Sequence, residues 1–326
     1  MVFISKKIIN GKERYYLEES IRLPKGKVKK YSLYLRDYNP GKKYSIEDYK
    51  IKLKEKIKEH LRETALKHYK KDYLFDEALI KRLEDTKLDW KEIKNKLTKN
   101  QLKDIIDRFT INFTYESNAI EGNSLTLKDV TIVLKEKKAL KNKDLREIYE
   151  TLNTREAMEL IFNNKLRINK KDIIKLHKIL VQNTGVSFGY KKLPNFLLDR
   201  DVETIKPENV EKEMENLIGW YHKNENIHPL QRASIFHGRL EKIHPFEDGN
   251  GRVGRLLINV MLINNGYIPI IIRKNQRIAY FNCLEAFDKG YKDRLIRFII
   301  EKYKRTYDRF FEVYMKYLKP SIKVKI

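Results

Sequence analysis

The chain has 326 residues, of which 41% are apolar and 11% aromatic, enough to bury a sizeable core, which argues against a disordered chain. Its 70 Lys and Arg residues against 45 Asp and Glu give a net charge of +25, which favours association with polyanions, although many lysines alternate with glutamates as on solvated helix faces. The single cysteine, Cys283, excludes an intramolecular disulfide and a four-cysteine zinc site.

Residues 1–40 show the pattern of three short strands. Asn10-Gly11 separates Ile8-Ile9 from Tyr15-Tyr16-Leu17, which is a strong hairpin signal. A turn at residues 24–26 leads to a third apolar run at residues 31–35. We predict a β-meander of unknown role, which is marginally stable alone and must pack on the helices that follow or on a partner.

From residue 46 onward, apolar residues recur at helical spacing, so we predict a mainly α protein. The region 41–108 is the helical N-terminal part. Within and beyond it we predict helices over residues 46–70, 73–84, 99–116, 126–137, 144–163, 170–182, 207–223, 229–242, 250–265, 277–289 and 293–318. Residues 185–207 contain glycine, proline and aspartate around a short apolar run, which predicts a loop with an extended piece.

Residues 244–255 combine the side chains that phosphate chemistry needs. Gly249 and Gly251 let backbone N–H groups approach an anion, and the helix predicted to begin beside them points its positive end there. Arg252 and Arg255 project from one side of that helix and can grip phosphate oxygens bidentately. A magnesium ligand, a further phosphate contact and a general base are predicted for Asp248, Asn250 and His244, respectively.

Two other phosphate-binding motifs do not account for this segment. Gly249-x-Gly251-x-x-Gly254 has the spacing of a dinucleotide fingerprint, but no buried apolar strand precedes it and no acidic residue lies about 20 positions beyond. A Walker-type loop is excluded because Gly-Lys-Ser/Thr occurs nowhere in the sequence. The block is therefore a phosphate-binding loop of another kind.

At these residues the sequence resembles the Fic (Fido) family, whose motif is His-x-Phe-x-(Asp/Glu)-Gly-Asn-Gly-Arg-x-x-Arg. Every specified position is present, and the resemblance extends from about Phe109 to Tyr307. It implies a helical catalytic core with a β-hairpin flap over residues 109–318, which transfers AMP from ATP to a Ser, Thr or Tyr hydroxyl of a target protein. It implies His244 as the base, Asp248 as the magnesium ligand and Asn250 as a contact to the α-phosphate. The residues it assigns to the phosphates are Gly249, Gly251, Arg252 and Arg255.

A shorter resemblance lies upstream. Ser117-Asn118-Ala119-Ile120-Glu121-Gly122-Asn123 is similar to the family's inhibitory motif, Ser/Thr-x-x-x-Glu-Gly/Asn. This implies that Glu121 pairs with Arg255 and occupies the place of the γ-phosphate, so that ATP binds unproductively. In some relatives the same glutamate supports removal of AMP. The alternative is a helix that ends at a glycine cap with a solvated Glu121.

The resemblance also implies two recognition regions. The loop from Gly185 to Asp201 matches the flap that clamps a target segment by strand addition, although Lys191 replaces the usual arginine. The flap edge is predicted at Leu193, Pro194, Asn195, Phe196, Leu197 and Leu198. The adenine side is predicted at Arg277, Tyr280 and Phe281, for which core packing of the two aromatic residues is the alternative.

The sequence thus predicts a protein adenylyltransferase with ATP as substrate and Mg²⁺ as cofactor, inhibited by Glu121. Its partners would be a target protein with an accessible hydroxyl and, as an open alternative, a second copy of the chain. No stretch approaches the roughly 18 to 20 uncharged apolar residues of a membrane span, so we expect a cytoplasmic protein. The other readings are a Fic enzyme with another nucleotide donor, and a nucleic-acid-binding or regulatory protein with a silent Fic core.

Overall fold

A computed structural model describes residues 2–22, 28–36, 38–40, 46–138, 140–195 and 203–318. The chain divides into two compact units. The first comprises Met1–His68 and Ile80–Asp85, and the second comprises Tyr69–Leu79 and Thr86–Ile326.

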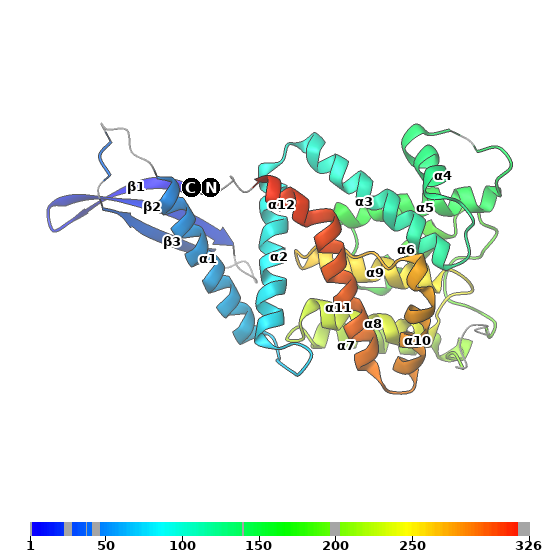
Figure 1. Cartoon of the computed structure of the whole chain (residues 1–326). Coiled ribbons are helices and arrows are strands. Elements are labelled where there is room, and N and C mark those ends of the chain that lie inside the picture. The colour runs from blue at the N-terminus through cyan, green and yellow to red at the C-terminus, as the bar shows by residue number, and fades with distance from the viewer. Residues whose placement is uncertain are drawn as a thin grey trace. The chain divides into compact units, whose positions relative to one another are not determined.

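The first unit contains the predicted β-meander. Strands β1 (Val2–Ile9), β2 (Lys12–Arg22) and β3 (Val28–Leu35) form an antiparallel sheet in that order. Asn10 and Gly11 both adopt positive φ, 52° and 72°, as the Asn-Gly turn requires. Helix α1 (Glu47–His68) covers one face of the sheet, where Leu53 and Ile57 pack with buried side chains of β2 and β3 (Figure 1). The sheet therefore packs on the helix that follows it, which is one of the two alternatives that the sequence left open.

The second unit is almost entirely helical. Its elements include α3 (Lys99–Ile120), α4 (Leu127–Thr131), α5 (Leu145–Phe162), α6 (Lys170–Leu180), α7 (Pro207–Lys223), α8 (Pro229–Ile243), α9 (Asn250–Asn264), α10 (Arg277–Asp288), α11 (Lys292–Thr306) and α12 (Glu312–Leu318). Short π-helical turns at Ile132–Glu136 and Tyr307–Phe311 follow α4 and α11, and a 3-10 turn at Lys274–Gln276 precedes α10. The mainly α fold is confirmed, and the π turns replace α-helix that the apolar spacing alone could not distinguish from them.

Helix α2 (Glu77–Lys96) corrects one prediction, because it ends well beyond residue 84. Trp90 and Ile93 are buried, and Trp90 meets the ring of Phe311 edge-on at 5.2 Å. Charged residues surround these two apolar side chains and mask their helical periodicity in the sequence. Thr98 and Gln101 then form a capping box that starts α3.

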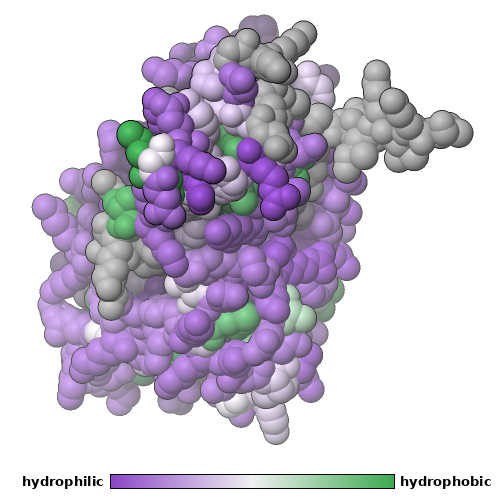
Figure 2. Space-filling model, turned by 90° about the vertical axis from the view of Figure 1, so that its left-hand side faces the viewer, coloured by the Kyte–Doolittle hydropathy of each residue, from purple (hydrophilic) through white to green (hydrophobic). Residues whose placement is uncertain are grey.

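Helices α8 and α9 form the centre of this unit and pack side by side (Figure 1). Nearly every residue of α9 is buried, which explains why its sequence is mostly apolar beyond the first two turns. The short segment 244–249 joins the two helices, so the predicted phosphate loop is anchored at both ends in the core. None of the described helices is long and apolar enough to cross a membrane. Figure 2 shows a face on which hydrophilic residues predominate and hydrophobic areas are small.

Candidate active site

The loop between α8 and α9 has a constrained backbone. His244 ends α8 with φ 50°, in the left-handed region, an unusual conformation for a residue with a side chain. Gly249 precedes α9 with φ 81°. Asn250 closes the loop: the backbone N–H of Phe246 donates to its Oδ1, and its Nδ2 donates to the carbonyl oxygen of Phe246, both at 2.9 Å. The amide predicted to contact an α-phosphate thus also holds the loop in shape.

The side chain of His244 is half-buried at the edge of this loop. Its Nδ1 lies 3.4 Å from the carbonyl oxygen of Glu241. When Nδ1–H donates to that carbonyl, the lone pair of the imidazole is on Nε2. This tautomer gives His244 a nitrogen that can accept a proton from a hydroxyl.

A second histidine supports the loop from beneath. The ring of His177 on α6 stacks on Phe246, with centroids 3.9 Å apart. Its Nδ1 accepts a hydrogen bond from the N–H of Gly189, so Nε2 carries the proton and donates to the carbonyl oxygen of Asp248 at 3.0 Å. Burial lowers the pKa of His177 to about 4, so the ring is neutral at physiological pH.

Arg252 and Arg255 rise from the first turns of α9 and are only 3% and 2% exposed. Nε of Arg252 and Nη1 of Arg255 are buried and have no hydrogen-bond partner among the described residues. Unsatisfied donors on buried guanidinium groups are costly. Because both lie next to Gly249 and Gly251 at the positive end of α9, they indicate a site for an anion.

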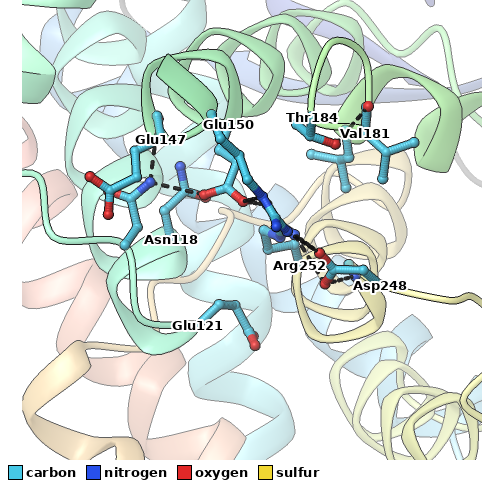
Figure 3. Close-up of polar contacts among 12 residues, drawn as sticks. Asn118, Glu121, Glu147, Glu150, Val181, Thr184, Asp248 and Arg252 are labelled. Atoms are coloured by element: carbon cyan, nitrogen blue, oxygen red, sulfur yellow. Dashed lines mark hydrogen bonds and ion pairs between the residues drawn. The ribbon is translucent and has the colours of Figure 1, made fainter. Parts of the chain in front are cut away.

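Glu121 reaches this site from the turn after α3, and Figure 3 shows it projecting toward the start of α9. Its Oε1 lies 2.7 Å from Nη2 of Arg255. A Cβ at Gly251 would lie 2.3 Å from the same carboxylate oxygen, so the carboxylate lies directly over the glycine. Ser117 accepts two further bonds from Arg255, at Oγ from Nε (3.0 Å) and at its carbonyl from Nη2 (2.9 Å). Gly122, with φ 100°, ends the helix, so a glycine cap and a paired Glu121 occur together.

Asp248 lies at the rim of the loop with its side chain 38% exposed. Its Oδ2 accepts from Nη2 of Arg146 at 2.6 Å and lies 3.3 Å from Nη2 of Arg252. No group of three or more His, Cys, Asp or Glu side chains that could hold a metal occurs among the described residues. A lone carboxylate still fits magnesium, which binds through one or two carboxylates together with substrate phosphates and water.

Helix α5 also contributes side chains to the site, which the sequence motif at residues 244–255 did not indicate. Glu150 pairs with Nη1 of Arg252 at 2.9 Å and accepts from Nδ2 of Asn123 at 3.0 Å (Figure 3). Glu147 accepts from the backbone N–H of Ser124. The turn after α3, the acidic side of α5 and the start of α9 are therefore joined by one polar network. Arg146, Glu147 and Glu150 lie about a hundred residues from the loop, with no local sequence signal.

The described part of the flap region lies beside the loop. Lys191 donates its backbone N–H to the carbonyl oxygen of Pro245 at 2.8 Å, and an isolated antiparallel bridge pairs Tyr190 with Phe246. Nζ of Lys191, which is 5% exposed, bonds Oδ1 of Asn195 at 2.7 Å, and burial lowers its pKa to about 8. Leu193 is 77% exposed. The remaining predicted flap residues Phe196, Leu197 and Leu198 lie outside the described residues.

The residues predicted for the adenine side come together behind the turn after α3. Nε of Arg277 donates to the carbonyl oxygen of Ile120 at 2.8 Å, and its guanidinium lies over the ring of Phe281. Tyr280 is fully buried, and its hydroxyl lies 2.7 Å from Nε2 of His237. These contacts join α10 to the end of α3 and to α8. Tyr280 therefore packs in the core, which was the alternative reading for the aromatic residues.

Fold and site together define a helical protein in which a loop with the geometry of an anion site lies at the start of a buried helix. Residues 167–262 match the model of the Fic/DOC family. This segment of the chain is therefore similar to a Fic/DOC domain.

Similar proteins agree with this assignment. The chain is 34% identical over 204 residues to a protein adenylyltransferase Fic from Nematostella vectensis, covering 60% of this chain and 47% of that protein. A Fic domain containing signaling protein from Bacteroides thetaiotaomicron superposes with a TM-score of 0.65 at 26% identity, over 72% of this chain and 97% of the other. Fic-1 from C. elegans has the same fold, with a TM-score of 0.63 at 22% identity over 74% of each chain. The chain spans less than half the length of the curated relatives it matches.

Proposed function

We propose that this chain is a protein adenylyltransferase, which transfers AMP from ATP to a Ser, Thr or Tyr hydroxyl of a target protein. The observation that carries the proposal is the pair of buried arginines, Arg252 and Arg255, whose unsatisfied N–H donors lie beside the α9 N-terminus. The name of the Nematostella relative supports this activity. A nucleoside triphosphate suits the site because it brings several anionic oxygens to two guanidinium groups and a helix end.

In the proposed reaction, the hydroxyl oxygen of the target attacks the α-phosphorus of ATP in line with the leaving group. The bond from the α-phosphorus to the bridging oxygen breaks, pyrophosphate leaves, and the hydroxyl proton passes to Nε2 of His244. The loop N–H groups and the two arginines stabilise the charge that develops on the phosphates. Asp248 would hold a magnesium ion, which would neutralise part of the charge on the phosphates. The exposed Leu193 lies in the segment that would receive the target.

We further propose that Glu121 inhibits this reaction. Its carboxylate forms an ion pair with Arg255 and covers Gly251, so an outer phosphate of ATP and this carboxylate compete for the same guanidinium. Both are anionic and cannot share the position. Removal of Glu121 leaves Arg255 held by its two bonds to Ser117, so the arginine would remain in place to bind phosphate.

The test is transfer of label from ATP labelled at the α-phosphate, with magnesium, to the protein itself and to a lysate. Wild type is compared with Glu121→Gly and with Glu121→Gly combined with His244→Ala. We expect Glu121→Gly to raise labelling by roughly tenfold or more, about 1.4 kcal/mol or more of barrier, and the double variant to abolish it. ATP labelled at the γ-phosphate should leave no label on protein, because that phosphate departs with pyrophosphate.

Two results would contradict the proposal. Label from the γ-phosphate on protein would indicate phosphate transfer instead of AMP transfer. Equal labelling by the single and double variants would mean that His244 is not the base in this reaction. Competition with unlabelled ATP, UTP and GTP identifies the donor nucleotide. If ATP is the donor, it should reduce labelling at a lower concentration than UTP or GTP.

A further inference from the structure

The sheet of the first unit has one face that α1 does not cover. Side chains alternate along each strand, and Leu17 and Leu35 point to α1, where they are 1% exposed. Their neighbours Tyr16 and Tyr34 are paired across β2 and β3 and point to the opposite side. We call this opposite side the open face. Phe3 and Tyr34 on it are 46% and 40% exposed.

The open face is strongly basic. Lys7, Lys12, Arg14 and Lys30 lie on it by strand alternation. In the part of the sheet that the structure describes, Glu18 is the single carboxylate on this side, and it pairs with both Lys7 and Lys30. Residues 1–36 as a whole hold ten Lys and Arg against three Asp and Glu. The positive charge of the chain is thus concentrated here with few compensating acids.

The arrangement costs the isolated sheet stability. Lys7 lies directly opposite Arg14 in the β1–β2 register, and like charges opposite one another destabilise a sheet. An interacting polyanion would relieve this repulsion. Glu18 offsets the repulsion at Lys7, and a polyanion that contacts Arg14 would lower it further.

Aromatic rings support the cations on this face. Nζ of Lys7 lies 4.5 Å from the ring centroid of Tyr16. The guanidinium of Arg14 lies over Tyr34, and Nζ of Lys30 lies over Phe3. Long side chains that rest on rings keep their charged ends at the surface and lose less freedom when they bind.

The same contacts bear on which polyanion fits. Single-stranded nucleic acid binds through bases that stack on exposed aromatic faces, but here a cation occupies a face of each of the three rings. The cations can contact phosphates while they remain on the ring faces. A duplex, whose bases are already stacked on one another, therefore fits the open face better than a single strand.

The width of the sheet favours duplex DNA over duplex RNA. Three strands at about 4.8 Å spacing place the outer strands roughly 10 Å apart, comparable to the roughly 12 Å major groove of B-form DNA, which admits β-structure. The major groove of duplex RNA is deep and narrow, and side chains cannot read it. An acidic protein fits less well, because lysine is depleted at protein–protein interfaces and three of the four cations are lysines.

We propose that the open face of the β1–β2–β3 sheet binds double-stranded DNA, with Lys7, Lys12, Arg14 and Lys30 contacting phosphates. This surface belongs to the first unit and is independent of the AMP transfer proposed for the second.

The experiment measures anisotropy of a fluorescein-labelled DNA duplex of about 20 base pairs with the full chain, between about 50 and 200 mM salt. The test variant is Lys12→Glu with Arg14→Glu, because the ion pairs of Glu18 are with Lys7 and Lys30 and these two substitutions leave them in place. The matched control is Lys171→Glu with Lys175→Glu, two exposed lysines of α6, which changes the net charge equally. A neutral pair, Lys12→Gln with Arg14→Gln, avoids new repulsion within the sheet, and far-ultraviolet circular dichroism checks each fold.

We expect wild type to bind duplex DNA with a slope of log affinity against log salt of about −4, as four phosphate contacts predict. The Gln pair should reduce the slope by about two, and the Glu pair should weaken binding by roughly tenfold or more, whereas the α6 control loses less than about threefold. Equal losses from the α6 control would overturn the proposal, since they would reflect net charge alone. Tighter binding to single-stranded DNA or to duplex RNA, or no binding at the lowest salt, would also overturn it.

Discussion

Glu150 on α5 holds Arg252 on α9 through a 2.9 Å ion pair in which the two side chains are only 12% and 4% exposed. The second oxygen of Glu150 accepts from Asn123, in the turn that also carries Glu121. Each of the two arginines of the loop thus has its own glutamate: Arg252 pairs with Glu150, and Arg255 pairs with Glu121. Glu150 is largely shielded from solvent, whereas Glu121 covers Gly251, where we propose that a phosphate binds.

We therefore expect Glu150→Ala to destabilise the domain. Breaking a buried pair by removal of one partner leaves an uncompensated charge and costs about 3 kcal/mol. Urea unfolding followed by circular dichroism measures the change. Glu156→Ala, an exposed residue of the same helix, is the control and should change the unfolding free energy by less than about 0.5 kcal/mol. Similar values for the two variants would show that Glu150 is not a structural partner of Arg252.

Arg146 leads to a different prediction, because its guanidinium pairs with the carboxylate of Asp248, which we propose binds magnesium. Its Nη2 lies 2.6 Å from Oδ2 of Asp248, and its side chain is 49% exposed. A metal ion must displace it, and an exposed pair is worth at most about 1 kcal/mol. In the Glu121→Gly background, Arg146→Ala should lower the magnesium concentration for half-maximal transfer, by roughly fivefold at most. The rate at saturating magnesium should stay within about twofold.

Magnesium titration of the transfer rate checks this expectation. Arg155→Ala on the same helix is the matched control, because Arg155 pairs with Glu159 and not with Asp248. A higher magnesium requirement in the Arg146 variant would mean that Arg146 helps to place Asp248 instead of competing for it.

The buried ring of His177 makes the stability of the domain depend on pH. Burial lowers the pKa of His177 to about 4 from an ordinary value of 6.5. Between these values the unfolded chain binds a proton that the folded chain does not, so stability is fully present above pH 6.5 and falls as the pH drops toward 4. At 1.36 kcal/mol per pKa unit, this loss amounts to about 3 kcal/mol. Urea unfolding at intervals from pH 7 to 4.5 measures it.

His177→Gln should flatten that pH profile, because the side chain no longer titrates. It does not remove the profile completely, because burial also lowers the pKa of His228. His222→Gln, at an exposed position of α7, loses a histidine without disturbing the loop and should keep the wild-type slope. An unchanged slope in the His177 variant would mean that the ring is not held neutral beneath Phe246.

Local sequence signals sufficed for the parts of the molecule that local chemistry determines. The Asn10-Gly11 turn, most helices and the break between the helices at residues 244–249 follow from residues within about one or two turns of each other. The end of α2 was wrong because Trp90 and Ile93 gain their burial from helices distant in sequence. The pairing of Glu121 with Arg255 was expected only because of the family resemblance.

The partners of the loop could not be read from the sequence. Arg146 and Glu150 lie on a helix rich in charged residues, and their spacing carries no motif. Likewise, the residue type of Asn250 suggests a phosphate contact, but its reciprocal bonds to Phe246 depend on the path of the folded loop. Long-range polar pairs follow from how α5 packs on α9, which single-sequence patterns do not encode.

A substitution at Gly251 distinguishes the proposed inhibition by Glu121 from the proposed binding of phosphate. A Cβ there would lie 2.3 Å from Oε1 of Glu121 and 2.9 Å from Nη1 of Arg255. In Gly251→Ala the methyl group would push the Glu121 carboxylate aside, which alone would relieve inhibition. The methyl group would also stand where a phosphate must approach the helix N-terminus, so we expect no gain of transfer.

The decisive comparison is Gly251→Ala in the Glu121→Gly background. With the carboxylate absent, the methyl group still meets Nη1 of Arg255, and transfer should fall by roughly a hundredfold relative to Glu121→Gly alone, about 2.7 kcal/mol of lost transition-state stabilisation. Gly219→Ala, where a Cβ has open space, is the control and should leave transfer unchanged. If Gly251→Ala by itself raises transfer as much as Glu121→Gly does, then Glu121 inhibits but no phosphate lies against Gly251, and the phosphates would have to bind farther from the start of α9.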